Sequence, residues 1–124
     1  MGKAAVKKPL RKIQIDSEKP SRPMEDPHFH SVAFLSKSLS DENRLRILAC
    51  VSQGKKSVTS IVEELGLSQP LVSHHLKELK RSLLVKIERS GPFIYYELSD
   101  ARIMDVVRML DTVAGDLLSS RDGF

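Results

Sequence analysis

The chain has 124 residues, of which 40% are hydrophobic and 29% are charged, and its formal net charge is +4. These values are typical of one globular domain and leave little room for a second. One cysteine, Cys50, excludes a disulfide within the chain and favours a reducing, cytoplasmic location; no apolar run approaches the roughly 18 residues of a membrane span.

The charge is unevenly distributed along the chain. Residues 1–26 carry seven basic and four acidic side chains, and residues 68–90 carry five and two, so each stretch has a net charge of +3. Residues 100–124 carry three basic and five acidic side chains, a net of −2. Basic stretches attract polyanions by counterion release, although a solvated surface with a charge bias explains them equally well.

The first 27 residues differ in composition from the rest of the chain. They hold four prolines, many charges and few large apolar residues, so they cannot bury enough surface to offset the entropy of folding. We expect a basic, disordered tail over residues 1–27, one folded domain over residues 28–120 and a flexible C-terminus over residues 121–124.

Four helices are predicted before residue 84. Apolar residues at helical spacing predict the first over residues 29–39, and Ser40 is expected to cap the second, which ends before Gly54. Ser57 and Ser68 are expected to cap a third and a fourth helix, separated by a turn at residues 66–68. The buried stripe expected on the fourth helix consists of Val72, Leu76, Leu79 and Leu83.

A hairpin and a last helix complete the predicted fold. Apolar and charged side chains alternate over residues 84–89, and residues 93–98 are rich in aromatic and β-branched residues. Residues 90–92 are expected to form a turn between these two strands. Ser99 or Asp100 is expected to cap a helix with a long apolar stripe. The predicted class is therefore α+β and mostly helical: a winged helix-turn-helix with four helices, a hairpin wing and a C-terminal helix.

The outer face of the fourth helix has the chemistry to read DNA. Gln69 can pair bidentately with adenine, Ser73 can donate or accept, and Leu71 can touch a thymine methyl. Lys77, Lys80 and Arg81 can hold phosphates, as can the amides at the start of the helix, and Arg89 on the wing can reach a minor groove.

Three segments together resemble the ArsR/SmtB family of repressors: LSDENRLRIL at residues 39–48, LSQPLVSHHL at residues 67–76 and RSGPFIYYEL at residues 89–98. The resemblance covers roughly residues 28–118. It implies a homodimer joined through the first and last helices, which binds operator DNA with one recognition helix per half-site, represses transcription and is released by an unidentified signal.

The resemblance and the helical pattern give two sets of candidate residues. The candidate DNA-binding residues are Ser68, Gln69, Pro70, Leu71, Ser73, His74, His75, Lys77, Arg81 and Arg89. The candidate dimer-interface residues are Phe29, Val32, Leu35, Ile103, Val106, Val107, Leu110, Val113, Ala114 and Leu117.

The chain departs from the family at its usual metal sites. The third helix has no cysteine and the last helix has no histidine, so we expect no metal and no cofactor. Ser82 occupies a position after the recognition helix that is usually glycine. Cys50 is interpreted as a small buried hydrophobe, with a redox sensor as the alternative. His28 and His30 are interpreted as surface or interface residues, with metal binding as the alternative.

No motif of a phosphate loop, nucleophile elbow or zinc hydrolase is present, so no catalytic residue is assigned. Two alternatives to a repressor stay open. One is a winged helix that binds another protein, and the other is an architectural DNA binder that does not read bases.

Overall fold

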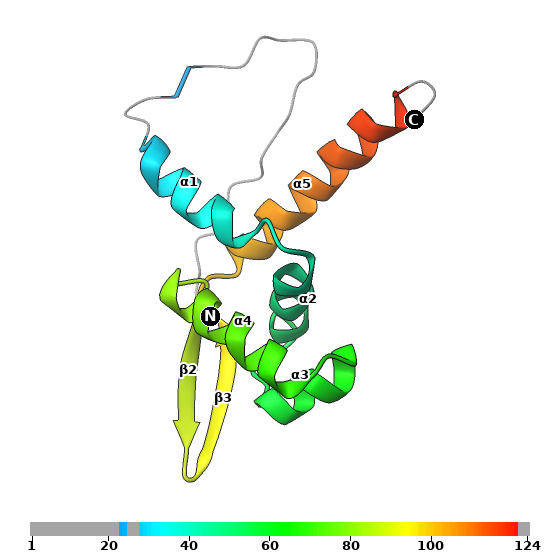
Figure 1. Ribbon diagram of the computed structural model, residues 1–124. Helices are drawn as coiled ribbons and strands as arrows, with labels where there is room; N and C mark the ends of the chain where they lie inside the picture. Colours follow the sequence, from blue (N-terminus) through cyan, green and yellow to red (C-terminus); the bar gives the residue numbers. More distant parts are fainter. Residues whose placement is uncertain (1–22, 25–27, 122–124) are drawn as a thin grey trace, which may run out of the picture.

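The computed structural model describes residues 23–24 and 28–121, which form a helical body with a projecting two-stranded hairpin (Figure 1). The elements are α1 (Phe29–Ser38), α2 (Glu42–Val51), α3 (Val58–Leu65), α4 (Gln69–Arg81), β2 (Val85–Ser90), β3 (Phe93–Leu98) and α5 (Arg102–Ser119). This order confirms the predicted fold class. The predicted tail over residues 1–27 and the flexible end over residues 121–124 lie almost entirely outside the described residues.

Local capping explains where the central helices begin. Ser57 Oγ accepts a hydrogen bond from the Ser60 amide at 3.1 Å, and Ser68 Oγ accepts one from the Leu71 amide at 3.3 Å. The predicted cap at Ser40 is wrong. Asp41 caps α2 by accepting from the Arg44 amide, because Ser40 instead closes the preceding turn by donating to the Lys37 carbonyl at 2.6 Å.

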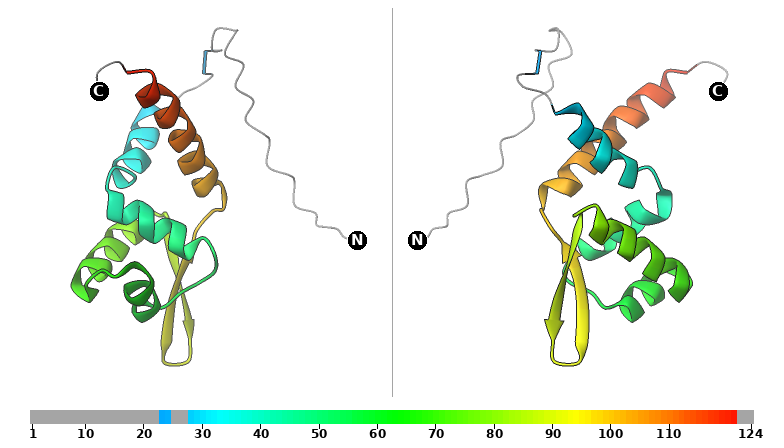
Figure 2. Two further views of the ribbon diagram at one scale, coloured as in Figure 1. Left: turned by 90° about the vertical axis from the view of Figure 1, so that its right-hand side faces the viewer. Right: turned by 60° about the vertical axis from the view of Figure 1, so that its left-hand side comes forward.

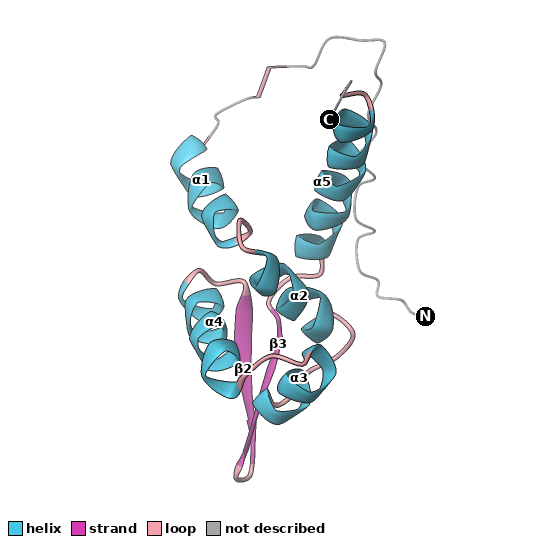
Figure 3. Ribbon diagram, turned by 45° about the vertical axis from the view of Figure 1, so that its right-hand side comes forward, coloured by secondary structure: helices cyan, strands magenta, loops and turns pink. Residues whose placement is uncertain are grey.

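The core lies where α2, α3, α4 and the base of the hairpin meet (Figure 3). Its fully buried side chains are Ile47, Leu48, Val51, Ile61, Val72, Leu76, Leu79 and Leu84. Each helix supplies one apolar stripe to this cluster, as the 3.6-residue period requires. The polar face of α4 is thereby held in a fixed position on the outside.

Leu83 does not belong to the buried stripe of α4. Its side chain is 72% exposed and its φ is +68°, while the next residue, Leu84, is buried in its place. Ser82, by contrast, has an ordinary φ of −88°, and its hydroxyl donates to the Glu78 carbonyl at 3.0 Å. The position after α4 that favours glycine is therefore Leu83, and the expectation for Ser82 was wrong.

Replacing Leu83 with glycine is expected to stabilise the protein by about 1 kcal/mol, because a side chain in the left-handed region costs about that much. Urea denaturation followed by circular dichroism measures the change in the free energy of unfolding. Leu83→Ala is the matched control, since alanine keeps the Cβ and should leave the strain in place. Equal stability of the two variants would contradict this explanation.

The hairpin is fastened to the helical body through the loop between α2 and α3. In β2 and β3, Val85 pairs with Leu98 at the base and Ser90 with Phe93 at the tip. Lys56 exchanges two backbone hydrogen bonds with Tyr96, at 2.9 and 2.8 Å, and so forms an isolated antiparallel β-bridge to β3. The orientation of the hairpin relative to α3 and α4 follows from this bridge.

Helices α1 and α5 project away from the core on the side opposite the hairpin tip (Figure 2). No residue of α1 is buried, and Met104 is the one buried residue of α5. Arg44 joins α1 to α2, because its Nε donates to the Ser38 carbonyl at 2.9 Å. Of the helices described here, none combines the length and the hydropathy that crossing a bilayer requires.

Candidate nucleic-acid interface

The exposed side of α4 carries most of the candidate DNA-binding residues. Its buried residues Val72, Leu76 and Leu79 pack into the core, so the opposite side must face solvent. Leu71 is half-buried at its edge. The exposed residues on or next to this helix are Ser68, Gln69, Pro70, Ser73, His74, Lys77, Lys80 and Arg81. They form a polar, basic surface on a helix whose width fits a major groove.

The turn before α4 is held by specific contacts. Gly66 ends α3 with a φ of +68°, a conformation that glycine adopts without strain. Arg46 Nη2 donates to the Leu65 carbonyl at 2.9 Å and so satisfies one free carbonyl at the end of α3. The two helices of the helix-turn-helix are thus fixed relative to each other.

His75 is not part of the exposed surface. Adjacent residues on a helix point about 100° apart, so with His74 turned outward the His75 ring faces inward, where it is 5% exposed. Its Nε2 lies 3.8 Å from Asp41 Oδ1, and its Nδ1 has no hydrogen-bond partner among the described residues. The structure therefore removes His75 from the candidate DNA contacts.

The hairpin presents Arg89 near its tip. Arg89 is exposed and lies opposite Ile94, next to the turn at residues 90–92. One side of the hairpin is fastened by Lys55, whose Nζ lies 2.6 Å from Glu88 Oε2 and 5.3 Å from the centre of the Tyr95 ring. Nothing in the sequence marks Lys55 and Lys56 as the residues that position the wing; only the folded contacts identify them.

The surface formed by α4 and the hairpin has an excess of free positive charge. Lys77, Lys80, Lys86 and Arg89 make no ion pair within the part of the chain that the structure describes. Arg81 pairs with Glu78 at 3.3 Å, but that contact is exposed and therefore weak. Unpaired cations beside a groove-sized helix are suited to DNA phosphates.

Known proteins are similar to this chain in sequence and in fold. Residues 41–86 match the model of the family described as bacterial regulatory protein, arsR family. The chain is 34% identical to the transcriptional repressor SdpR of Bacillus subtilis, over 60% of this chain and 82% of that protein. It is 32% identical to the arsenical resistance operon repressor of Staphylococcus aureus, over 68% and 82% of the two chains. The chain belongs to the ArsR family.

A solved structure supports the same assignment for this ArsR-family chain. It matches the homodimeric winged helix-turn-helix DNA-binding domain of a possible ArsR-family regulator from Mycobacterium bovis. The TM-score is 0.65 at 27% identity, and the match covers 77% of this chain and 89% of the other. The winged helix and the family resemblance predicted from the three motifs are thus confirmed, and the family is one of regulatory proteins rather than enzymes.

Cys50 has the environment of a core residue in this ArsR-family protein. It is buried, its Sγ lies 3.6 Å from Glu64 Oε1, and burial raises the pKa of its thiol. Because the thiolate is the reactive form, these contacts favour the interpretation as a small hydrophobe over that of a redox sensor. Among the described residues, no three His, Cys, Asp or Glu side chains gather as a metal site would require.

The candidate interface residues of α1 and α5 form exposed apolar surface in the single chain. Ile103 and Val107 are half-buried against the core, and the remaining eight candidates are exposed. Phe34 and Leu118 are also exposed apolar residues on these helices, and the sequence-based set did not include them. Exposed apolar surface shared by neighbouring residues is typical of sites of association.

Stability is expected to fall as the pH drops below about 6.5, because His75 is buried. Desolvation lowers the pKa of His75 below its ordinary value of 6.5, against the opposing effect of Asp41. As the pH falls, the unfolded chain therefore binds a proton at this site before the folded chain does. The loss of stability begins near the pKa of His75 in the unfolded chain and is complete below its pKa in the folded chain.

Thermal unfolding between pH 8 and pH 5 tests this expectation. His75→Gln should show a flatter decline than the wild type, whereas His74→Gln keeps the buried ring and should decline as the wild type does. The slope from one site cannot exceed about 1.4 kcal/mol per pH unit. A wild-type decline that persists in His75→Gln would show that another group is responsible.

Proposed function

We propose that this protein is a transcriptional repressor that binds operator DNA as a homodimer through two copies of α4. The observation that carries the proposal is the solvent-facing side of α4, which presents base-reading and phosphate-binding groups on a rigidly packed helix. Membership of the ArsR family supports it, since SdpR and the arsenical resistance operon repressor are both described as repressors.

The residues of the surface take different roles in this proposal. Gln69, Leu71, Ser73 and His74 read base edges, and Pro70 with the cap at Ser68 places the start of α4 against the groove. Lys77, Arg81 and Arg89 contact the DNA backbone. These assignments keep the sequence-based set except for His75, whose ring is buried against the core.

The dimer forms through the exposed apolar residues of α1 and α5. A two-fold axis through this surface would place two copies of α4 on successive turns of one DNA face, which is the arrangement a pseudo-palindromic operator requires. The solved relative from Mycobacterium bovis is described as homodimeric, which supports this assembly. The cytoplasm is the proposed site of action.

Selection of bound duplexes from a random pool, followed by fluorescence anisotropy at physiological salt, tests the function. The selected duplex should bind on the order of 10³-fold or more tightly than a scrambled duplex of equal length. The duplex upstream of the protein's own gene is the first natural sequence to compare. Equal weak binding to selected and scrambled DNA would favour an architectural binder, and no DNA binding would favour a protein-interaction module.

A further inference from the structure

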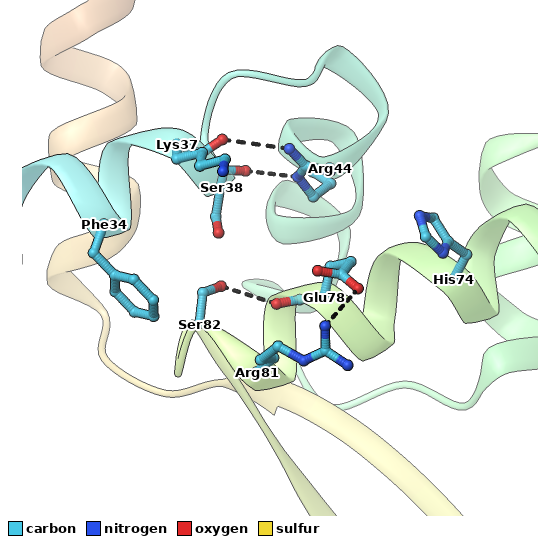
Figure 4. Close-up of a pocket in the computed structure, with 8 residues that line it drawn as sticks. All are labelled: Phe34, Lys37, Ser38, Arg44, His74, Glu78, Arg81 and Ser82. Atoms are coloured by element: carbon cyan, nitrogen blue, oxygen red, sulfur yellow. Dashed lines mark hydrogen bonds and ion pairs between the residues drawn. The ribbon is translucent and has the colours of Figure 1, made fainter.

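A solvent-open cavity of about 470 Å³ lies between α1, the start of α2 and the second half of α4 (Figure 4). Its walls combine α1, one of the two helices proposed for dimerisation, with α4, the helix proposed to read DNA. It is lined by Phe34, Lys37, Ser38, Arg44, His74, Glu78, Arg81 and Ser82. Of these, His74 and Arg81 belong to the proposed DNA-binding surface, whereas Lys37 and Arg44 were not among the sequence-based candidates.

The charge of the lining is positive. Three cations, Lys37, Arg44 and Arg81, line the cavity together with one carboxylate, Glu78, so these four side chains carry a net charge of +2. Glu78 is already engaged by Arg81 at 3.3 Å, and Lys37 Nζ has no partner within the described part of the chain. The cavity therefore holds a cation without a counterion.

Arg44 contributes charge from a fixed position. Its Nε donates to the Ser38 carbonyl at 2.9 Å and its Nη2 donates to the Lys37 carbonyl at 3.3 Å, so the guanidinium is anchored to the end of α1. No carboxylate forms an ion pair with it among the described residues. An anchored guanidinium and a free ammonium that line one cavity are donors of the kind that proteins use for phosphate.

We propose that this cavity is an oxyanion site that binds one phosphate group, with Lys37 and Arg81 as direct ligands and Arg44 as a positioned source of positive charge. The phosphate has two possible sources, a phosphodiester of bound DNA or a free phosphate-bearing molecule. Because His74 and Arg81 lie both in the cavity wall and on the DNA-facing side of α4, a free anion bound here competes with DNA. The DNA source rests on the proposed function, whereas the free anion does not.

Titration of the DNA-free protein with inorganic phosphate tests the site itself. The amide signals of residues 37–38 and 78–82 should shift saturably in nuclear magnetic resonance spectra, at constant ionic strength set with sodium chloride. Lys37→Gln should weaken phosphate binding at least tenfold, whereas Lys77→Gln, which removes the same charge from α4 outside the cavity, should not. Shifts that do not saturate, or that weaken equally in both variants, would overturn the proposal.

The salt dependence of DNA binding distinguishes the two sources. If the phosphate belongs to DNA, Lys37→Gln should lower the slope of log affinity against log salt by about 0.9 on every duplex. If it belongs to a free anion, the slope should stay unchanged, and inorganic phosphate should weaken DNA binding by the wild type more than by Lys37→Gln. If neither effect is observed, both sources of the phosphate are overturned. If the wild type shows no sequence preference for DNA, the proposed function is refuted, but the phosphate titration remains a valid test of the site.

Discussion

Leu110→Glu on α5 is expected to dissociate the homodimer and to weaken operator binding by about 100-fold or more. Leu110 is 54% exposed in the single chain, and Leu117, two turns further along the same stripe, is 63% exposed. Burying a leucine contributes about 1.5–3 kcal/mol, and a two-fold interface contains each residue twice. A glutamate there both forfeits this burial and places two carboxylates in an apolar contact.

Loss of the dimer lowers affinity because the two half-sites are no longer read by one molecule. The second recognition helix then binds from free solution instead of at the high effective concentration that the linked partner has. Sedimentation velocity should show a monomer, and anisotropy on the operator should show the loss.

The control for this variant is Thr112→Glu. It adds the same charge to α5 at an exposed position that shares a helical face with Arg108 and Asp116, away from the apolar stripe. It should remain dimeric and should bind DNA nearly as the wild type does. A dimeric Leu110→Glu variant would show that the exposed face of α5 is not the interface.

Combined replacement of Gln69 and Ser73 by alanine is expected to lower the affinity for operator DNA by about 10²-fold to 10³-fold. Each base contact contributes about 1–3 kcal/mol of discrimination, and both side chains are exposed on the same side of α4. Binding to a scrambled duplex should scarcely change, because neither residue carries charge. Anisotropy on the two duplexes at one salt concentration measures the difference.

The comparison for this experiment is a variant that removes a phosphate contact, because its loss of affinity should not depend on the DNA sequence. Lys77→Ala should weaken binding to the operator and to the scrambled duplex alike and should lower the salt slope by about one. Its side chain is exposed on α4 and has no ion-pair partner among the described residues. A uniform loss in the Gln69 and Ser73 double variant as well would contradict base reading by this helix.

The errors of the sequence-based prediction lie at helix ends and at one neighbouring pair. Ser40 and Asp41 are both good caps, and only the backbone path between α1 and α2 assigns the cap to Asp41. Leu83 has the right spacing for burial, but the helix has already ended there, and the left-handed backbone conformation of Leu83 itself turns its side chain outward. His74 and His75 have the same chemistry, and their orientation relative to the core separates them.

Most features that depend on near neighbours along the chain could be predicted from the sequence, apart from the cap of α2 and the residue that ends α4. Helical periodicity, the caps at Ser57 and Ser68 and the alternation in the hairpin act over a few residues, so the winged helix and the polar side of α4 could be predicted. Only the tertiary structure brought Lys55 to Glu88, Lys56 to Tyr96, and Lys37 to the cavity beside Arg81. These contacts join elements distant in the sequence, and their geometry follows from how the helices pack around the core.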